Sequence, residues 1–246
     1  MSHTHERCIK ALTLLLAASI ALAQKPHDSN WVLTFADEFD GAELDLGKWS
    51  PHEPGGQARD AHPEALTLSG GQLHVTARRA NKGYIPGIVT TFGTFAQRYG
   101  RFEIRCRVPA GRGLRAIVSL RPVPLAPLPA IGLLEVNGTT PSTISFANDW
   151  GTEQTRRSFG DSFPAPDLSL GFHTIAIEWD QDKILWSIDG KDKFQSLDGV
   201  PRQSMFLSLE LAVGGGTGSL AARTPDASTP FPASFDIDYI RVYQHK

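Results

Sequence analysis

The stretch GRFEIRCRV, residues 100–108, decides the fold class because its apolar and polar side chains alternate. One face of this segment carries Phe102, Ile104, Cys106 and Val108. A period of two is typical of a strand with one buried and one solvated face. The basic residues of the segment therefore belong to the solvated face. They do not form the concentrated basic patch that a nucleic-acid surface needs.

Other segments repeat this pattern along the chain. SFDIDYIRVYQ (234–244) alternates in the same way, while LTLSGGQLHVTA (66–77) and HTIAIEWDQDKILWSIDG (173–190) each indicate two strands joined by a turn. The 17 prolines and 23 glycines fall largely between such runs, and no long amphipathic helix or fixed repeat interrupts them. We therefore predict an all-β fold, a β-sandwich or jelly roll of two antiparallel sheets, over residues 31–246.

Composition and cysteine content are consistent with one large core. The chain has 246 residues, 41% of them hydrophobic, and a formal net charge of −2, so we expect no nucleic-acid partner. Cys8 lies in the N-terminal segment discussed next, which leaves Cys106 without an internal disulfide partner. Its place in the apolar alternation indicates a buried thiol.

The N-terminus has the pattern of a secretory signal. Charged residues precede the apolar run ALTLLLAASIALA (11–23), which ends in the small-residue triplet Ala21, Leu22, Ala23. We expect cleavage after Ala23, a short tail at residues 24–30, and a secreted or periplasmic product with no membrane attachment. A buried N-terminal helix is the alternative that the same pattern allows.

Several common catalytic motifs are absent from the sequence. There is no H-E-x-x-H, no Cys-x-x-Cys and no G-x-S-x-G, so zinc and serine-hydrolase chemistry have no sequence support. GRGLRA (111–116) loosely fits a dinucleotide motif, but it lies between two strand-like runs and does not open a helix. We expect no organic cofactor.

Five segments in register resemble glycoside hydrolase family 16. They are FADEFDG (35–41), YGRFEIRCRVPAGRGL (99–114), FHTIAIEWDQDKILWSIDG (172–190), ELAVGGG (210–216) and FDIDYIRVYQ (235–244). This family includes β-1,3- and β-1,3-1,4-glucanases and galactan hydrolases that act on algal polysaccharides. The resemblance implies a β-jelly roll whose concave sheet is the substrate cleft, a polysaccharide partner and a monomer.

The catalytic strand of that family carries E-x-D-x-x-E, which is a nucleophile, a supporting Asp and an acid/base. Alignment with PLPAIGLLEVNGTTP (127–141) places Ala130 at the nucleophile, Gly132 at the Asp and Glu135 at the acid/base. Retaining hydrolysis needs two carboxyl groups about 5–5.5 Å apart. Two of the three functional side chains are therefore missing, and we expect hydrolysis to be absent or strongly impaired.

Other cleft positions implied by the resemblance also differ from the family pattern. Arg115 and Ser119 replace aromatic residues, Asn148 lies near a common His position, and Glu210 replaces an Asn. Because sugars stack on aromatic faces and bind planar polar groups, these replacements weaken glycan binding. Trp150 is either a remaining stacking residue or a core aromatic.

Glu210 is a carboxylate that the family pattern lacks. Strand alternation puts Ser208, Glu210 and Ala212 on one face, so Glu210 is a candidate partner for Glu135. A separation of about 6.5–9.5 Å would suit an inverting mechanism. The alternative is an acid at the cleft rim without a catalytic role.

The resemblance also implies a structural calcium ion. Glu38 and Asp238 match the usual ligands, and the Gly71 carbonyl is a third candidate. Hard oxygen donors suit Ca²⁺. Alternatively, both carboxylates cap or hydrogen-bond neighbouring strands.

Three hypotheses follow for function. The first is a catalytically impaired family member with a remodelled cleft, and we favour it. The second is an active polysaccharide hydrolase that uses Glu135 with a second carboxylate such as Glu210. The third is a structural or protein-interaction module, since function belongs to the site and not to the fold.

Overall fold

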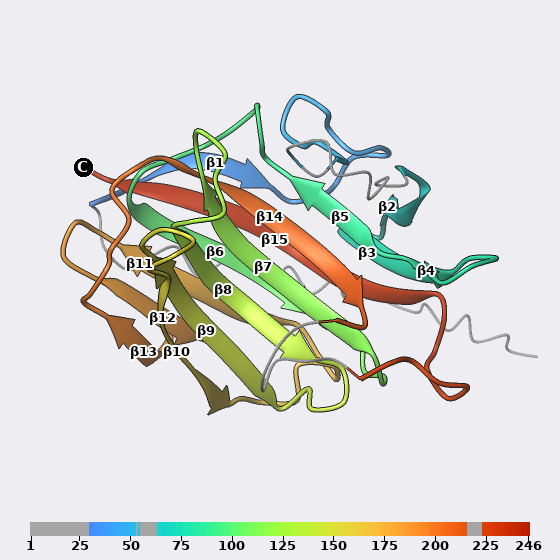
Figure 1. The fold of residues 1–246 in the computed structure, drawn as a ribbon. Coiled ribbons are helices and arrows are strands. Elements are labelled where there is room, and N and C mark those ends of the chain that lie inside the picture. Colours follow the sequence, from blue (N-terminus) through green and yellow to red (C-terminus); the bar gives the residue numbers. More distant parts are fainter. Residues whose placement is uncertain (1–29, 53, 55–62, 216–222) are drawn as a thin grey trace, which may run out of the picture.

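Two stacked antiparallel sheets make up the computed structural model, which describes residues 30–52, 54, 63–215 and 223–246 (Figure 1). The predicted signal segment and residues 24–29 of the tail lie outside the described residues. The two-sheet, all-β prediction is confirmed. In the described part of the chain, one short 3-10 turn, Pro63–Ala65, is the only helical element, and no helix there could span a membrane.

The nine-stranded sheet contains both N- and C-terminal strands. Its order is β13 (Lys191–Ser196), β12 (Ile184–Ile188), β11 (His173–Trp179), β6 (Gly100–Arg107), β15 (Ala233–His245), β3 (Gln72–Arg79) and β2 (Leu66–Ser69); β1 (Trp31–Asp37) pairs with β15 and β4 (Tyr84–Ile85) with β3.

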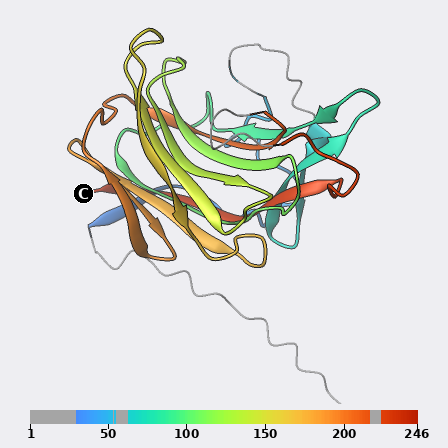
Figure 2. The same ribbon diagram turned by 60° about the horizontal axis from the view of Figure 1, so that its bottom comes forward.

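The six-stranded sheet carries the predicted catalytic strand. Its order is β10 (Arg157–Pro164), β9 (Thr143–Trp150), β8 (Ala130–Asn137), β7 (Leu114–Pro122), β14 (Met205–Val213) and β5 (Gly87–Thr90). This sheet curves, and its concave side faces away from the nine-stranded sheet (Figure 2).

Alternating side chains fill the space between the sheets as the sequence pattern predicts. The apolar face of β6, including Cys106, is almost completely buried, and in β7 every second residue from Leu114 to Pro122 is buried. Burying an aliphatic or aromatic side chain of this size contributes about 1.5–3 kcal/mol. The other face of β7 is left free to line the concave side.

Both predicted hairpins are present. β2 and β3 pair antiparallel around Gly70 and Gly71, whose φ angles of +61° and +70° favour glycine. β11 and β12 form the second hairpin at residues 180–183.

Candidate active-site cleft

A bulge in β8 puts the three aligned catalytic positions on one face. The pairing of β8 with β9 shifts register between Gly132 and Glu135, and Leu133 and Leu134 are both buried. An extra residue in a strand lets positions of odd spacing share a face. Ala130, Gly132 and Glu135 are all half-buried on the concave side. The bulge thus brings the three aligned positions together, and among these three only Glu135 has a carboxylate.

Glu135 is held by an arginine from the neighbouring strand. Arg115 donates from Nη1 to Glu135 Oε1 at 2.8 Å, and the two side chains are 16% and 20% exposed. Burial raises the pKa of Glu135; Arg115 offsets part of this effect, while the charge of Asp149 adds to it. Glu135 therefore holds its proton to higher pH than an ordinary glutamate, as a general acid requires.

Arg115 and Ser119 both lie on the concave face of β7, where sequence analysis placed them. Ser119 is opposite Gly132 on β8 and opposite Ser208 on β14. At these two positions the floor of the cleft therefore offers a hydroxyl group and a guanidinium group that is already paired with a carboxylate.

Glu210 shares this face but stands two strands away from Glu135. Both residues lie opposite Ile117 of β7, one on each side. With neighbouring strands about 4.8 Å apart, their Cα atoms are about 10 Å apart. Ser208 and Ala212 alternate with Glu210 on the same side, as predicted.

Asp149 is an acid of this face that sequence analysis missed. It pairs with Ala130 across β8 and β9, so it stands directly beside the vacant nucleophile position. Arg156 donates to its Oδ2 at 3.0 Å, whereas its Oδ1 is buried and has no hydrogen-bond partner among the described residues. Alternation counted from the apolar Phe146 would have put Ala147 and Asp149 on the polar side.

Asn148 faces the opposite way, which corrects its predicted role in substrate binding. It is fully buried, and its amide donates to the Asp198 carbonyl at 2.8 Å and to Ser196 at 3.3 Å.

Trp150 is two residues beyond Asn148 and lies on the same face of β9. Its indole packs so closely on Gly199 that a Cβ at position 199 would overlap the ring. This contact favours the packing role for Trp150.

The candidate calcium ligands are engaged by arginines. Arg241 donates to both carboxylate oxygens of Glu38 at 2.7 Å, and Arg105 pairs with Asp238. Among residues that the structure describes, no group of three or more acidic, His or Cys side chains could hold a metal. A calcium ion would have to displace both guanidinium groups, so this arrangement does not fit one, and the ion stays a prediction.

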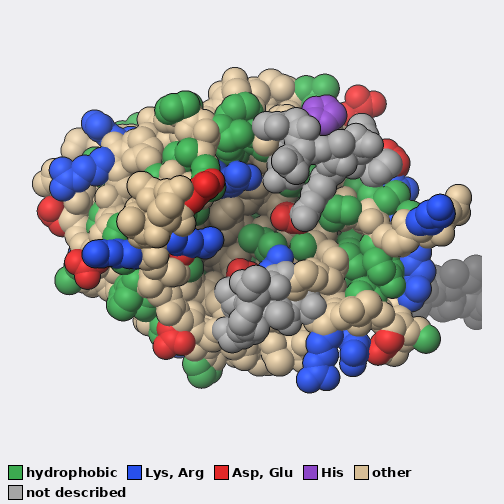
Figure 3. Space-filling view, viewed as in Figure 1, with side chains coloured by type: hydrophobic (Ala, Val, Ile, Leu, Met, Phe, Trp, Pro, Cys, Tyr) green, Lys and Arg blue, Asp and Glu red, His purple; other side chains and the backbone are tan. Residues whose placement is uncertain are grey.

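The concave face is hollowed over the middle of the six-stranded sheet, with acidic and basic side chains in and around the hollow (Figure 3).

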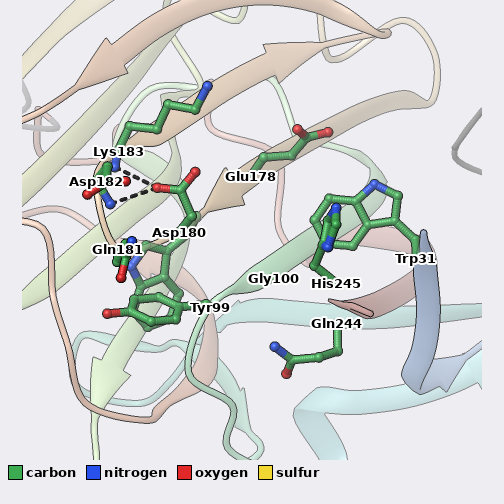
Figure 4. Close-up of a pocket in the computed structure, with 11 residues that line it drawn as sticks. Trp31, Tyr99, Gly100, Glu178, Asp180, Gln181, Asp182, Lys183, Gln244 and His245 are labelled. Carbon is green, nitrogen blue, oxygen red and sulfur yellow. Dashed lines mark hydrogen bonds between the residues drawn. The ribbon is translucent and has the colours of Figure 1, made fainter.

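A separate pocket lies on the nine-stranded sheet, lined by residues that include Trp31, Tyr99 and His245 (Figure 4). Two of its acids have structural partners: Asp180 accepts two backbone N–H groups in the β11–β12 turn, and Glu178 binds Arg101 at 2.8 Å. The cleft, not this pocket, contains the aligned catalytic positions.

The fold is a β-sandwich whose six-stranded sheet carries a row of polar residues along its concave face. Residues 61–220 match the family model described as glycosyl hydrolases family 16, which is more than half of the chain. The protein belongs to this family.

Relatives that are named for glucan hydrolysis match nearly all of this chain. It is 28% identical to a beta-glucanase of Rhodothermus marinus, over 95% of this chain and 92% of that protein. It is 25% identical to glucan endo-1,3-beta-glucosidase A1 of Niallia circulans, over 93% of this chain but only 40% of that protein's length. The laminarinase catalytic domain of Thermotoga maritima has a TM-score of 0.76 and 27% identity, covering 88% of this chain and 99% of that structure.

Proposed function

We propose that this protein is an exported β-glycan-binding member of family 16 in which retaining hydrolysis is strongly impaired. The observation that carries the proposal is the β8 bulge, which presents Ala130, Gly132 and Glu135 on one face. Only one of these three positions has a carboxylate. Without a nucleophile opposite the acid, the covalent intermediate of the retaining route cannot form.

The proposed ligand class rests on the relatives and on the chemistry of the cleft. Two relatives that match nearly all of this chain are named for glucan hydrolysis. In β7, β8 and β9, the concave-face positions are Arg115, Ile117, Ser119, Arg121, Ala130, Gly132, Glu135, Asn137, Thr143, Ser145, Ala147 and Asp149. None of these positions in the three described strands is aromatic, so we expect binding through hydrogen bonds and with low affinity.

The repaired cleft provides the test. An ideal Cβ at Gly132 would lie 3.4 Å from Ala147 N and 3.5 Å from its Cβ, which is ordinary van der Waals contact. The double variant Ala130→Glu, Gly132→Asp should therefore fold. We would measure reducing ends released from β-1,3-glucan, β-1,3-1,4-glucan, agarose and carrageenan, together with binding to each polysaccharide by affinity electrophoresis.

The expected result is glycan binding by both proteins and turnover at least about 10²-fold faster in the repaired one. Adding Glu135→Gln to the repaired protein is the matched control and should abolish the gain. Rapid hydrolysis by the unaltered chain would overturn the proposal and favour the active hydrolase with Glu135 and Glu210. Absence of binding in both proteins would favour the structural or interaction module.

Export and calcium are separate parts of the proposal. N-terminal sequencing of the processed protein should begin at Gln24, and a start at Met1 in the mature protein would contradict export. Because Arg241 and Arg105 already pair with Glu38 and Asp238, we expect calcium to leave the melting temperature unchanged relative to EDTA; a bound ion would raise it, since a ligand of the folded state stabilises that state. An unchanged melting temperature would show that the arginine pairs replace the ion.

A further inference from the structure

Asp149 is a carboxylate one strand from the vacant nucleophile position. Paired residues on antiparallel strands have Cα atoms about 5 Å apart, so Asp149 stands that far to the side of Ala130. Both side chains project onto the concave face, as Glu135 does. The cleft therefore holds a second acid near the place where the family pattern has lost one.

The unmet hydrogen-bonding capacity of this face suits a polyhydroxylated ligand or an ordered water molecule. Asp149 Oδ1, Asn137 Oδ1 and Arg115 Nε are buried and have no hydrogen-bond partner within the described residues. Leaving such groups unsatisfied is costly, so each of them favours a bound hydrogen-bonding partner. A sugar hydroxyl or a water molecule could donate to the two oxygens and accept from the guanidinium nitrogen.

The surroundings of the two carboxyl groups differ in a way that suits opposite roles. Arg156 donates to Asp149 Oδ2 at 3.0 Å, which leaves the buried Oδ1 to accept a hydrogen bond from a water molecule. Burial raises the pKa of Glu135, and the nearby charge of Asp149 adds to this effect. One acid and one base are the requirements for hydrolysing a glycosidic bond without a covalent intermediate.

The geometry differs from that of a retaining pair. The side chain of Asp149 is one methylene shorter than that of the glutamate that the family pattern has at position 130. Asp149 also lies on the neighbouring strand, to the side of that position. Both differences lengthen the gap to Glu135 beyond the about 5–5.5 Å of retaining enzymes, toward the about 6.5–9.5 Å that leaves room for a water molecule. Glu210 lies on the other side of β8 from Asp149, with β7 between its own strand β14 and β8.

We propose that Asp149 and Glu135 form a base–acid pair that hydrolyses a bound β-glycan slowly and with inversion. Asp149 accepts a proton from water as the water oxygen bonds to the anomeric carbon. Glu135 donates its proton to the glycosidic oxygen as the bond from that oxygen to the anomeric carbon breaks. The products are two shorter glycans, and proton exchange with solvent restores both carboxyl groups. This inference rests on the proposed function, since it requires glycan in the cleft.

The test follows the anomer formed on prolonged incubation with a β-1,3-gluco-oligosaccharide, read by ¹H NMR before mutarotation. Inversion releases the α-anomer, whereas retention releases the β-anomer. The native chain would be compared with Asp149→Asn, Glu135→Gln and Glu210→Gln. Asp161→Asn is the matched control, because Asp161 lies on the exposed strand β10 opposite the buried Phe146.

We expect slow release of the α-anomer, reduced at least about 10²-fold by Asp149→Asn or Glu135→Gln and unchanged by Asp161→Asn. The native rate should also fall as pH rises through the pKa of Glu135. Release of the β-anomer, or loss with Glu210→Gln but not with Asp149→Asn, would overturn this pair. Glycan binding without any turnover would overturn it while leaving the proposed function intact, whereas absence of binding would overturn both.

Discussion

Trp186 donates its indole N–H to the main-chain carbonyl of Gly132 at 2.9 Å, across the sandwich. Trp186 belongs to β12 of the nine-stranded sheet and is fully buried, while Gly132 lies at the β8 bulge of the other sheet. A bulge disrupts the strand ladder locally, so a carbonyl there needs another donor. The bulge of β8 is therefore stabilised from the core side, independently of the side chains that face the cleft.

Replacing Trp186 with Phe should destabilise the protein by about 1–3 kcal/mol. The substitution keeps an aromatic ring but leaves the Gly132 carbonyl buried without its donor. Urea denaturation would measure the change, with Trp31→Phe as control because Trp31 packs edge-on against His245 in a half-buried position. Equal losses in the two variants would show that the hydrogen bond to the bulge has no special weight.

Asp236 should make stability depend on pH in the acid range. Burial alone would raise its pKa, but hydrogen bonds from Ser234, His74 and Arg107 outweigh burial and lower it below 3.8. A carboxyl group with a lowered native pKa stabilises the fold above its unfolded pKa, and that stability is lost as pH falls through the native pKa. Asp236→Asn should therefore cost about 1.5–3 kcal/mol at pH 7, since its side chain is only 9% exposed, and progressively less below pH 3.8.

Unfolding free energies of the native chain and of Asp236→Asn, measured at several pH values, would check this dependence. Asp192→Asn on the exposed strand β13 serves as control and should change stability by less than about 0.5 kcal/mol. A constant difference between the native chain and Asp236→Asn down to pH 2 would contradict the expectation.

Strand periodicity allowed most of the fold to be predicted, because half-buried strands such as β6 and β7 repeat every two residues. Periodicity alone does not reveal a bulge, since it is one residue that breaks the repeat. The resemblance of PLPAIGLLEVNGTTP to the family's catalytic strand placed Ala130, Gly132 and Glu135 without predicting the bulge, which the pairing of β8 with β9 reveals. In the segment FANDWG (146–151), the resemblance led the sequence analysis to Asn148, near a common His position, in place of Asp149. This offset of one residue moves a side chain to the other face.

Pairings between distant segments were beyond sequence reasoning. Arg241 lies 203 positions from Glu38, and Arg105 lies 133 positions from Asp238. Each arginine meets its acid only after the strands have paired. Acids that a motif identifies as metal ligands can therefore be ion-pair partners in the folded chain.

Arg115 sets how strongly Glu135 holds its proton, and its removal should raise the Glu135 pKa further. Burial is the largest influence and raises that pKa. Arg115 lowers the pKa through its charge and its 2.8 Å hydrogen bond. In Arg115→Gln only burial and the charge of Asp149 remain as large influences. The ¹³C chemical shift of the Glu135 carboxyl group, followed against pH, should give a higher midpoint than in the native chain. Arg241→Gln at the distant Glu38 pair is the control and should leave the midpoint unchanged.

Arg115→Gln should also change how the free energy of unfolding depends on pH. A carboxyl group with a raised native pKa contributes stability that is complete below its unfolded pKa and is lost as pH rises through the native pKa. Without Arg115 the burial cost of the ionised Glu135 is no longer offset, so Arg115→Gln should lose more stability between acid and neutral pH than the native chain does. A lower titration midpoint in Arg115→Gln, or a stability difference that shrinks as pH rises, would show that Arg115 is not the main cation acting on this acid.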